Sequence, residues 1–256
     1  MRSFVMNILS AFLALLYGMK GGYTQVNVKG QSIRIAVDNA RTLQRAKTYS
    51  IKEPDTLDWL DSFEPNSVFF DLGANIGQYS LYPAKKFGDA IQVYAFEPQC
   101  INYYLLNKNI YLNKLEKNVT AYGVAISGVS GFSKLYIPKF IAGGNRSQFG
   151  NEDLNTMKRP ASHIQGMFGV TLDDLCSKWG LPCPNYIKID VDGIEIPIIR
   201  GAETTLKNLE VRSVIVELGT SEEQDEAVKL LEQAGFKVKF KTTRNWGETC
   251  FIFERA

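Results

Sequence analysis

VFFDLGANIG, residues 68 to 77, is the stretch that decides the fold. Its apolar start is typical of a buried strand, and Asp71 lies near the carboxyl end of that strand, where open α/β sheets bind ligands. Gly73 and Gly77 follow, and the amphipathic segment 78 to 87 predicts a helix. Gly73 can adopt backbone angles that a side chain forbids, so the chain can turn sharply off the strand. We therefore predict a strand, a glycine loop and a helix whose first N–H groups and dipole face a bound ligand.

The loop differs from the dinucleotide fingerprint G-x-G-x-x-G, because three other residues separate its two glycines. A ligand without a pyrophosphate, but with an amino-acid part and a ribose, therefore fits better. A second strand is predicted over residues 91 to 96 and is followed by Glu97 and Pro98. An acidic residue at this point accepts hydrogen bonds from both ribose hydroxyls in related sheets. This spacing favours a nucleoside-binding loop over a purely structural one.

Length and composition exclude several other classes of protein. The chain has 256 residues, enough for one large α/β domain, and its 45% hydrophobic and 22% charged content is ordinary for a globular protein. A net charge of +2 gives no argument for nucleic-acid binding. The four cysteines include no C-x-x-C pair, so neither a zinc site nor a disulfide framework is indicated, and a reducing compartment is favoured.

The N-terminal part divides into two segments before the main domain. Residues 1 to 22 contain an apolar helix over 3 to 19, whose length is at the lower limit for a membrane span. This helix either packs on the protein or contacts a membrane, and a signal peptide is disfavoured because no cleavage site follows. Residues 23 to 66 are predicted to form a hairpin turning at 29 to 31 and a helix over 56 to 63. The main domain spans residues 67 to 256.

Strands and helices alternate through the main domain, which predicts a doubly wound, mostly parallel α/β sheet. A short link joins the last two strands, so these must be antiparallel. Residues 138 to 168 show no regular pattern, and a loop of this length is usually functional or disordered. It contains His163, either a base or simply exposed, and Arg146, which either contacts an acidic glycan or is solvated. The remaining strands are predicted at 119 to 122, 131 to 137, 186 to 189, 211 to 218, 236 to 241 and 249 to 254.

These motifs resemble the FkbM family of S-adenosylmethionine-dependent methyltransferases. The resemblance spans roughly residues 26 to 220 and rests on VFFDLGANIG at 68 to 77, YAFEP at 94 to 98, VTLDDL at 170 to 175 and, above all, YIKIDVDGIEIPIIRGA at 186 to 202. RAKT at 45 to 48 and KEP at 52 to 54 are also similar to the family. Asp192 is a departure, because the family more often has Glu there.

The resemblance implies the Rossmann-like sheet of class I methyltransferases, with seven strands in the order 3-2-1-4-5-7-6. It also implies methyl transfer from S-adenosylmethionine to an oxygen, typically a hydroxyl of a sugar, glycan or related natural product. The expected cofactor-binding residues are Asp71, Gly73, Ala74, Asn75 and Gly77 for the methionine part, Glu97 and Pro98 for the ribose, and Val124 and Ala125 near the adenine.

The expected catalytic residues are Asp190, Asp192 and Glu195, at the end of the fourth core strand. Asp190 is expected to act as a general base or a metal ligand, with the other two assisting, and Glu217 lies at the end of the next strand. The alternative is that Asp192 and Glu195 cap the following helix. A magnesium site remains open because hard oxygen ligands converge there, but no residue is assigned to a metal.

Two other functions compete with this interpretation. One is an NAD-dependent sugar-modifying enzyme, which the glycine spacing and the antiparallel strand pair disfavour. The other is a non-catalytic protein that retains the fold, and a nucleic-acid base methyltransferase is weaker still.

The expected partner is a small-molecule or glycan acceptor, with no nucleic acid. Because S-adenosylmethionine is made in the cytosol, we expect a cytoplasmic enzyme. Membrane association through residues 3 to 19 and a homo-oligomer remain open.

Overall fold

The computed structural model describes residues 12, 16 and 22 to 256. The apolar helix predicted over residues 3 to 19 lies, apart from residues 12 and 16, outside the described residues. Within the described ranges, no helix has both the length and the apolar character needed to cross a membrane.

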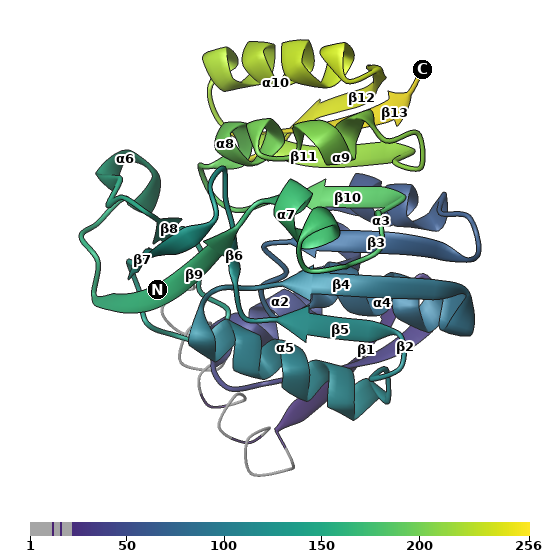
Figure 1. Ribbon diagram of the computed structural model, residues 1–256. Helices are drawn as coiled ribbons and strands as arrows, with labels where there is room; N and C mark the ends of the chain where they lie inside the picture. The colour runs from purple at the N-terminus through teal and green to yellow at the C-terminus, as the bar shows by residue number, and fades with distance from the viewer. Residues whose placement is uncertain (1–11, 13–15, 17–21) are drawn as a thin grey trace.

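A seven-stranded sheet forms the centre of the molecule, in the order β12-β13-β11-β10-β3-β4-β5 (Figure 1). The strands from β11 to β5 are parallel, and β13 is antiparallel to both neighbours. The predicted doubly wound, mostly parallel fold with an antiparallel last strand, in the order 3-2-1-4-5-7-6, is confirmed. The strands are β3 (Ser67–Leu72), β4 (Ile91–Phe96), β5 (Val119–Tyr122), β10 (Tyr186–Ile189), β11 (Ser213–Leu218), β12 (Phe236–Thr243) and β13 (Thr249–Arg255).

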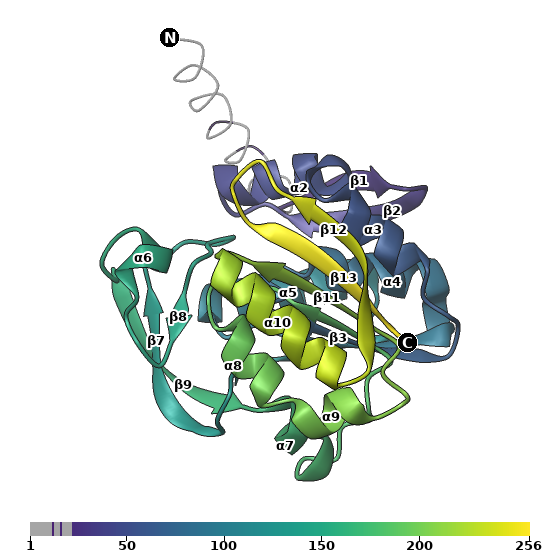
Figure 2. The same cartoon turned by 90° about the horizontal axis from the view of Figure 1, so that it is seen from above.

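Helices cover both faces of this sheet, because neighbouring residues of a strand point to opposite faces. Phe69 belongs to a core beneath α3, α4 and α5, whereas Phe70 belongs to a core beneath α7 to α10. Figure 2 shows these two layers on either side of the sheet. Burial on both faces explains why β3 and β10 read as continuous apolar runs. The helices are α3 (Pro54–Asp61), α4 (Gln78–Phe87), α5 (Cys100–Asn113), α7 (Leu172–Ser177), α8 (Glu195–Arg200), α9 (Glu203–Lys207) and α10 (Ser221–Gln233).

The N-terminal hairpin turns at Lys29 and Gly30, as predicted, and both residues have positive φ. Strand β1 (Tyr23–Val28) pairs with β2 (Gln31–Ala36). Helix α2 (Ala40–Lys52) is absent from the predicted elements, because most of its residues are polar. Its one clear sequence signal is a capping box between Asn39 and Thr42. Hairpin, α2 and α3 pack on the same core as Phe69, so they extend one helical layer of the domain.

A second sheet, in the order β6-β9-β7-β8, lies beside the carboxyl ends of β3 and β4 (Figure 1). The prediction that residues 138 to 168 lack regular structure is wrong, because β8 (Gln148–Phe149), α6 (Leu154–Met157) and most of β9 (His163–Val170) lie there. Strand β7 (Gly131–Ile137) has its predicted bounds. Strand β6 (Ala125–Ile126) pairs with β9 and does not extend β5.

Two glycines explain why β9 escapes sequence-based prediction. Gly166 and Gly169 break the apolar alternation that marks a strand, since glycine contributes no side chain to either face. At Gly169 an added Cβ would lie 2.4 Å from the ring of Phe149 in β8. Tight packing of the second sheet therefore requires the residue that obscures its pattern.

Candidate functional site

The two glycines of the loop serve different purposes. Gly73 has φ +80°, and an added Cβ would lie 1.9 Å from the carbonyl oxygen of Asp190, so the loop lies directly against the end of β10. Gly77 has φ +90°, and its added Cβ would lie 2.5 Å from Leu106 in α5. Gly73 therefore shapes the site at the sheet end, whereas Gly77 allows α4 and α5 to pack closely.

The main chain of the loop is occupied by contacts within the protein. The N–H groups of Gly73 and Ala74 both donate to the carbonyl of Phe96, at 3.0 Å. The N–H groups of the next three residues, 75 to 77, donate to Glu97, to the Asn75 side chain and to the carbonyl of Ala74. A ligand over this loop is therefore recognised by shape and by side chains, not by the loop N–H groups.

Glu97 lies where the sequence predicts, just beyond the carboxyl end of β4. It is 5% exposed, and its two carboxylate oxygens accept the N–H groups of Asn75 at 2.8 Å and Gln99 at 3.0 Å. Burial raises the pKa of Glu97 to about 7, although these hydrogen bonds oppose the shift. The side chain thus ties the glycine loop to the start of α5 and changes charge near neutral pH.

Beside a third cavity of about 260 Å³, which shares Asp190 and Asp192 with the second and is also lined by Glu195, two connected cavities open at this end of the sheet. The first is the narrower, and its wall includes Glu97, Pro98 and Ala125. The second is wider, about 220 Å³, and its wall includes Ala74, charged side chains of α2 and the β12–β13 turn. Five residues line both cavities, which makes them one continuous site: Gly73, Asn75, Asn145, Asp190 and Asp192.

Asp190 and Lys188 form an ion pair at the end of β10. Lys188 Nζ is 2.7 Å from Asp190 Oδ2 and 4.0 Å from Asp71 Oδ1. The Lys188 side chain is 5% exposed and that of Asp190 is 30% exposed. Burial alone would raise the pKa of Asp190, but the charge of Lys188 outweighs it and holds this pKa below its usual value. Asp190 is therefore a permanently charged carboxylate facing both cavities.

Asp192 and Glu195 have different environments. Asp192 adopts φ +64°, a strained conformation for a residue with a side chain, and its Oδ2 accepts the N–H of Arg146 at 2.6 Å. Burial, followed by the charge of Asp190, raises the pKa of Asp192 to about 6. Glu195 accepts the N–H of Gly193 and has a pKa raised by burial to about 8. Glu195 thus stabilises the turn before α8 but does not cap the helix, so the capping alternative is wrong in that form, whereas Asp192 faces both cavities.

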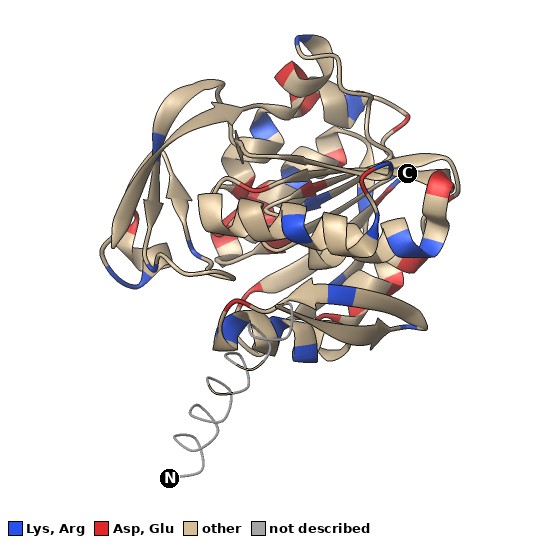
Figure 3. Ribbon diagram, turned by 90° about the horizontal axis from the view of Figure 1, so that it is seen from below, with Lys and Arg blue, Asp and Glu red and all other residues tan. Residues whose placement is uncertain are grey.

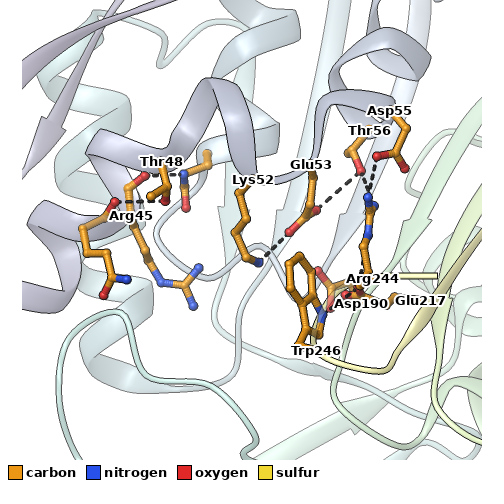
Figure 4. A network of polar contacts seen from close by, with 12 residues as sticks. Arg45, Thr48, Lys52, Glu53, Asp55, Thr56, Asp190, Glu217, Arg244 and Trp246 are labelled. Carbon is orange, nitrogen blue, oxygen red and sulfur yellow. Dashed lines mark hydrogen bonds and ion pairs between the residues drawn. The ribbon is translucent and has the colours of Figure 1, made fainter. Parts of the chain in front are cut away.

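The far wall of the second cavity comes from distant parts of the chain (Figure 4). Glu217, at the end of β11, accepts a hydrogen bond from Trp246 Nε1 at 3.3 Å and lies 3.5 Å from Arg244 Nε. Burial, followed by the charge of Asp190, raises the pKa of Glu217 to about 9, so this side chain is protonated at neutral pH. Lys52, at the end of α2, lies 4.7 Å from the centre of the Trp246 ring.

Several expected site residues lie away from the cavity walls. Asp71 is 1% exposed, and burial raises its pKa; its carboxylate accepts the hydroxyl of Ser80 and lies near Lys188. Gly77 packs against α5, as described above, and Val124 packs into a core cluster. His163 is exposed at the start of β9. These residues support the site or lie outside it, and they do not line either cavity.

Residues that the motif search missed come mainly from α2 and from the segment between β7 and β8. Arg45 and Lys52 line the second cavity, and Asn145 lines both. The RAKT and KEP resemblances covered the first two without indicating a role. Among the described residues, no cluster of three or more His, Cys, Asp or Glu side chains is arranged to hold a metal ion.

Comparisons with known proteins place the chain in a family. A family model described as "Methyltransferase FkbM domain" matches residues 71 to 238. Hexuronic acid methyltransferase AglP of Haloferax volcanii is 25% identical over 207 residues, covering 81% of this chain and 79% of that protein. Methyltransferase sdnD of Sordaria araneosa is 30% identical over 198 residues, covering 68% of this chain and 74% of that protein.

Solved structures support the fold. The FkbM methyltransferase of Methylobacillus flagellatus KT has a TM-score of 0.53 at 15% identity; the match covers 75% of this chain and 44% of that one. A putative rRNA-methylase of Clostridium thermocellum has a TM-score of 0.50 at 13% identity, covering 79% of this chain and 94% of that one. At such identities the likeness extends to the architecture alone.

Proposed function

We propose that this chain, which belongs to the FkbM methyltransferase family, transfers a methyl group from S-adenosylmethionine to a hydroxyl oxygen of a sugar, glycan or related natural product. Family membership makes the chain a methyltransferase, and the donor and acceptor are the subject of the proposal. The observation that carries it is the continuity of two cavities, one beside Glu97 and one beside Asp190, across Gly73.

The first cavity suits the nucleoside part of the cofactor. Its wall combines the buried carboxyl group of Glu97, which suits ribose hydroxyls, with apolar Ala125 and Ile126, which suit an adenine ring. Gly73, where a Cβ would collide with Asp190, keeps the passage to the second cavity free of a side chain. We assign Glu97, Pro98 and Ala125 to the nucleoside, and Gly73, Ala74 and Asn75 to the methionine part.

The acceptor hydroxyl belongs in the second cavity, beside Asp190 and Asp192. S-adenosylmethionine supplies a methyl group already activated by its sulfonium. The protein must therefore align an oxygen with that methyl group and accept the proton. Asp190, kept ionised by Lys188, orients the hydroxyl. Asp192, with a pKa of about 6, is ionised at neutral pH yet basic enough to accept the proton, so we assign it that role.

A sugar acceptor is supported by one relative and by the cavity wall. The relative AglP is named for a hexuronic acid, which is a sugar. The wall of the second cavity is largely polar, and Trp246 at 41% exposure offers a flat apolar surface of the kind that packs on sugar rings. The NAD-dependent alternative has no support from the family match. Because the donor is made in the cytosol, the site is expected to face that compartment.

Methyl transfer from labelled S-adenosylmethionine to a panel of sugars and glycans tests the proposal. Calorimetry with S-adenosylhomocysteine and with NAD should show binding of the first alone. Asp192→Asn should lower kcat about 100-fold or more and leave the affinity for S-adenosylhomocysteine within about twofold. Binding of NAD in place of S-adenosylhomocysteine would contradict the proposal. Full binding without transfer to any acceptor would favour the non-catalytic alternative.

A further inference from the structure

Three arginines gather around Asn145 at the second cavity. Arg41 Nη2 donates to Asn145 Oδ1 at 2.8 Å, and Arg45 Nε donates to the carbonyl of Gly143 at 3.0 Å. Arg45 and Arg146 line the cavity, and all three side chains are partly buried. In the part of the chain that the structure describes, none of the three has a carboxylate within 4.0 Å.

The other two cations that line the second cavity do have acidic partners. Basic and acidic residues are interspersed over the ribbon in Figure 3, and the other cations of the second cavity are neutralised by neighbours. Lys52 pairs with Glu53 at 2.6 Å, and Lys188 pairs with Asp190 at 2.7 Å. Asp192 contributes an attractive charge to Arg41, but its Oδ2 is used by a backbone N–H. The three arginines therefore lack an ion-pair partner at contact distance, although Asp190, Asp192 and Glu248 attract them from farther away.

Burial and the closeness of the other two arginines disfavour the charge of Arg41. Burial lowers the pKa of Arg41, and the charges of Arg45 and Arg146 lower it further. Side chains that repel one another in this way are stabilised by an anion between them. Guanidinium groups match a carboxylate in particular, because their planar N–H forks bind both of its oxygens.

A carboxylate bound over the glycine loop would need a positively charged side chain as its partner. The N–H groups of the loop, from residues 73 to 77, are all donated within the protein. They are therefore not available to a carboxylate placed over the loop. Arg45 lines the same cavity as Gly73 and Asn75, and its carbonyl accepts a hydrogen bond from Gln78 at the start of α4. It is the cation best placed to supply what the loop main chain does not.

We propose that Arg45 and Arg146, which line the second cavity, form a carboxylate-binding site for the methionine part of the cofactor, with Arg41 holding Asn145 beside them. This inference rests on the proposed function. The same chemistry has a second source, an acidic group on the acceptor, because the second cavity also contains Asp190 and Asp192. The position of Arg45 beside the loop favours the cofactor, and the two sources are separable by experiment.

Calorimetry on the full chain with two probes tests the site. S-adenosylhomocysteine carries the carboxylate, whereas 5′-methylthioadenosine has the same nucleoside and sulfur without the amino-acid part. Arg45→Gln should weaken binding of the first probe about tenfold to a hundredfold, the loss expected for a charged hydrogen bond. Binding of 5′-methylthioadenosine should change less than about twofold on the same scale, and Arg45→Lys should recover part of the affinity.

Lys47→Gln is the matched control, because it removes one positive charge from an exposed position of the same helix, α2. It should leave both affinities unchanged, and circular dichroism should report equal folding of all variants. If Arg45→Gln instead lowers kcat/KM for a glucuronide but not for the matching glucoside, the carboxylate belongs to the acceptor. Unchanged affinities and unchanged kcat/KM would overturn the site. A wild-type chain that binds neither probe would refute the proposed function itself.

Discussion

Lys188→Met should be the most destabilising single change at the site. Lys188 is buried and is the one cation within 4.0 Å of both Asp71 and Asp190 in the described part of the chain. Removing one partner of a buried ion pair costs about 3–5 kcal/mol, and the 30% exposure of Asp190 favours the lower half of that range. With a urea m-value near 3 kcal/mol/M for a chain of this size, the midpoint should fall by about 1 M.

The unfolding free energy lost in Lys188→Met should depend on pH in a defined direction. Without Lys188, burial raises the pKa of both Asp71 and Asp190 above the ordinary 3.8. A carboxyl group with a raised folded-state pKa costs stability above its unfolded pKa, and the cost disappears as the pH falls below that value. In the wild type, by contrast, the lowered pKa of Asp190 stabilises the fold above pH 3.8. The difference between the proteins should therefore be largest near pH 7 and shrink toward pH 4.

Urea unfolding followed by circular dichroism at several pH values measures this difference. Lys207→Met is the matched control, since Lys207 forms an exposed pair with Glu203 at 2.6 Å. An exposed pair of this kind is worth at most about 0.5 kcal/mol. If Lys188→Met loses as little unfolding free energy as the control, or if its loss grows as the pH falls, Lys188 does not stabilise the two carboxylates as argued.

Three further changes test separate parts of the site. Gly77→Ala should lower the unfolding free energy by about 2–4 kcal/mol in a denaturant titration, because φ is +90° and the new Cβ would meet Leu106; a neutral result would contradict the packing. Glu97→Gln should weaken S-adenosylhomocysteine binding about tenfold, and wild-type affinity should rise from pH 6 to pH 8 as Glu97 ionises; calorimetry without a pH dependence would oppose this. Trp246→Ala should raise the acceptor KM about fivefold, whereas Trp179→Ala, 47% exposed and on neither cavity wall, should not.

The central sheet follows from the sequence because its signals are local. A buried parallel strand is apolar throughout, and β3 and β10 each show such a run, ending beside Gly73 or Asp190. Glu97 is placed correctly for the same reason, since the length of one βα unit sets its position at the sheet edge. These features need no knowledge of distant contacts.

The arginine group and the wall around Trp246 do not follow from the sequence, because tertiary contacts create them. Helix α2 is mostly polar, and only its packing on the core directs Arg45 and Lys52 into the second cavity. Trp246 comes from a turn almost 200 residues further along the chain. No spacing rule links these positions, so only the fold brings them to one site.

Asp71 and Glu195 illustrate a further limit of motif reading. A carboxylate beside a glycine loop suggests a ligand contact, yet Asp71 is buried against Ser80 and Lys188. Glu195 likewise binds the N–H of Gly193 before α8. Asp71 supports the lysine that keeps Asp190 charged, whereas Glu195 fixes the turn that carries Asp192 and also lines the third cavity. A motif therefore contains residues that shape a site as well as residues that line it, and only the cavity walls of the folded chain separate the two.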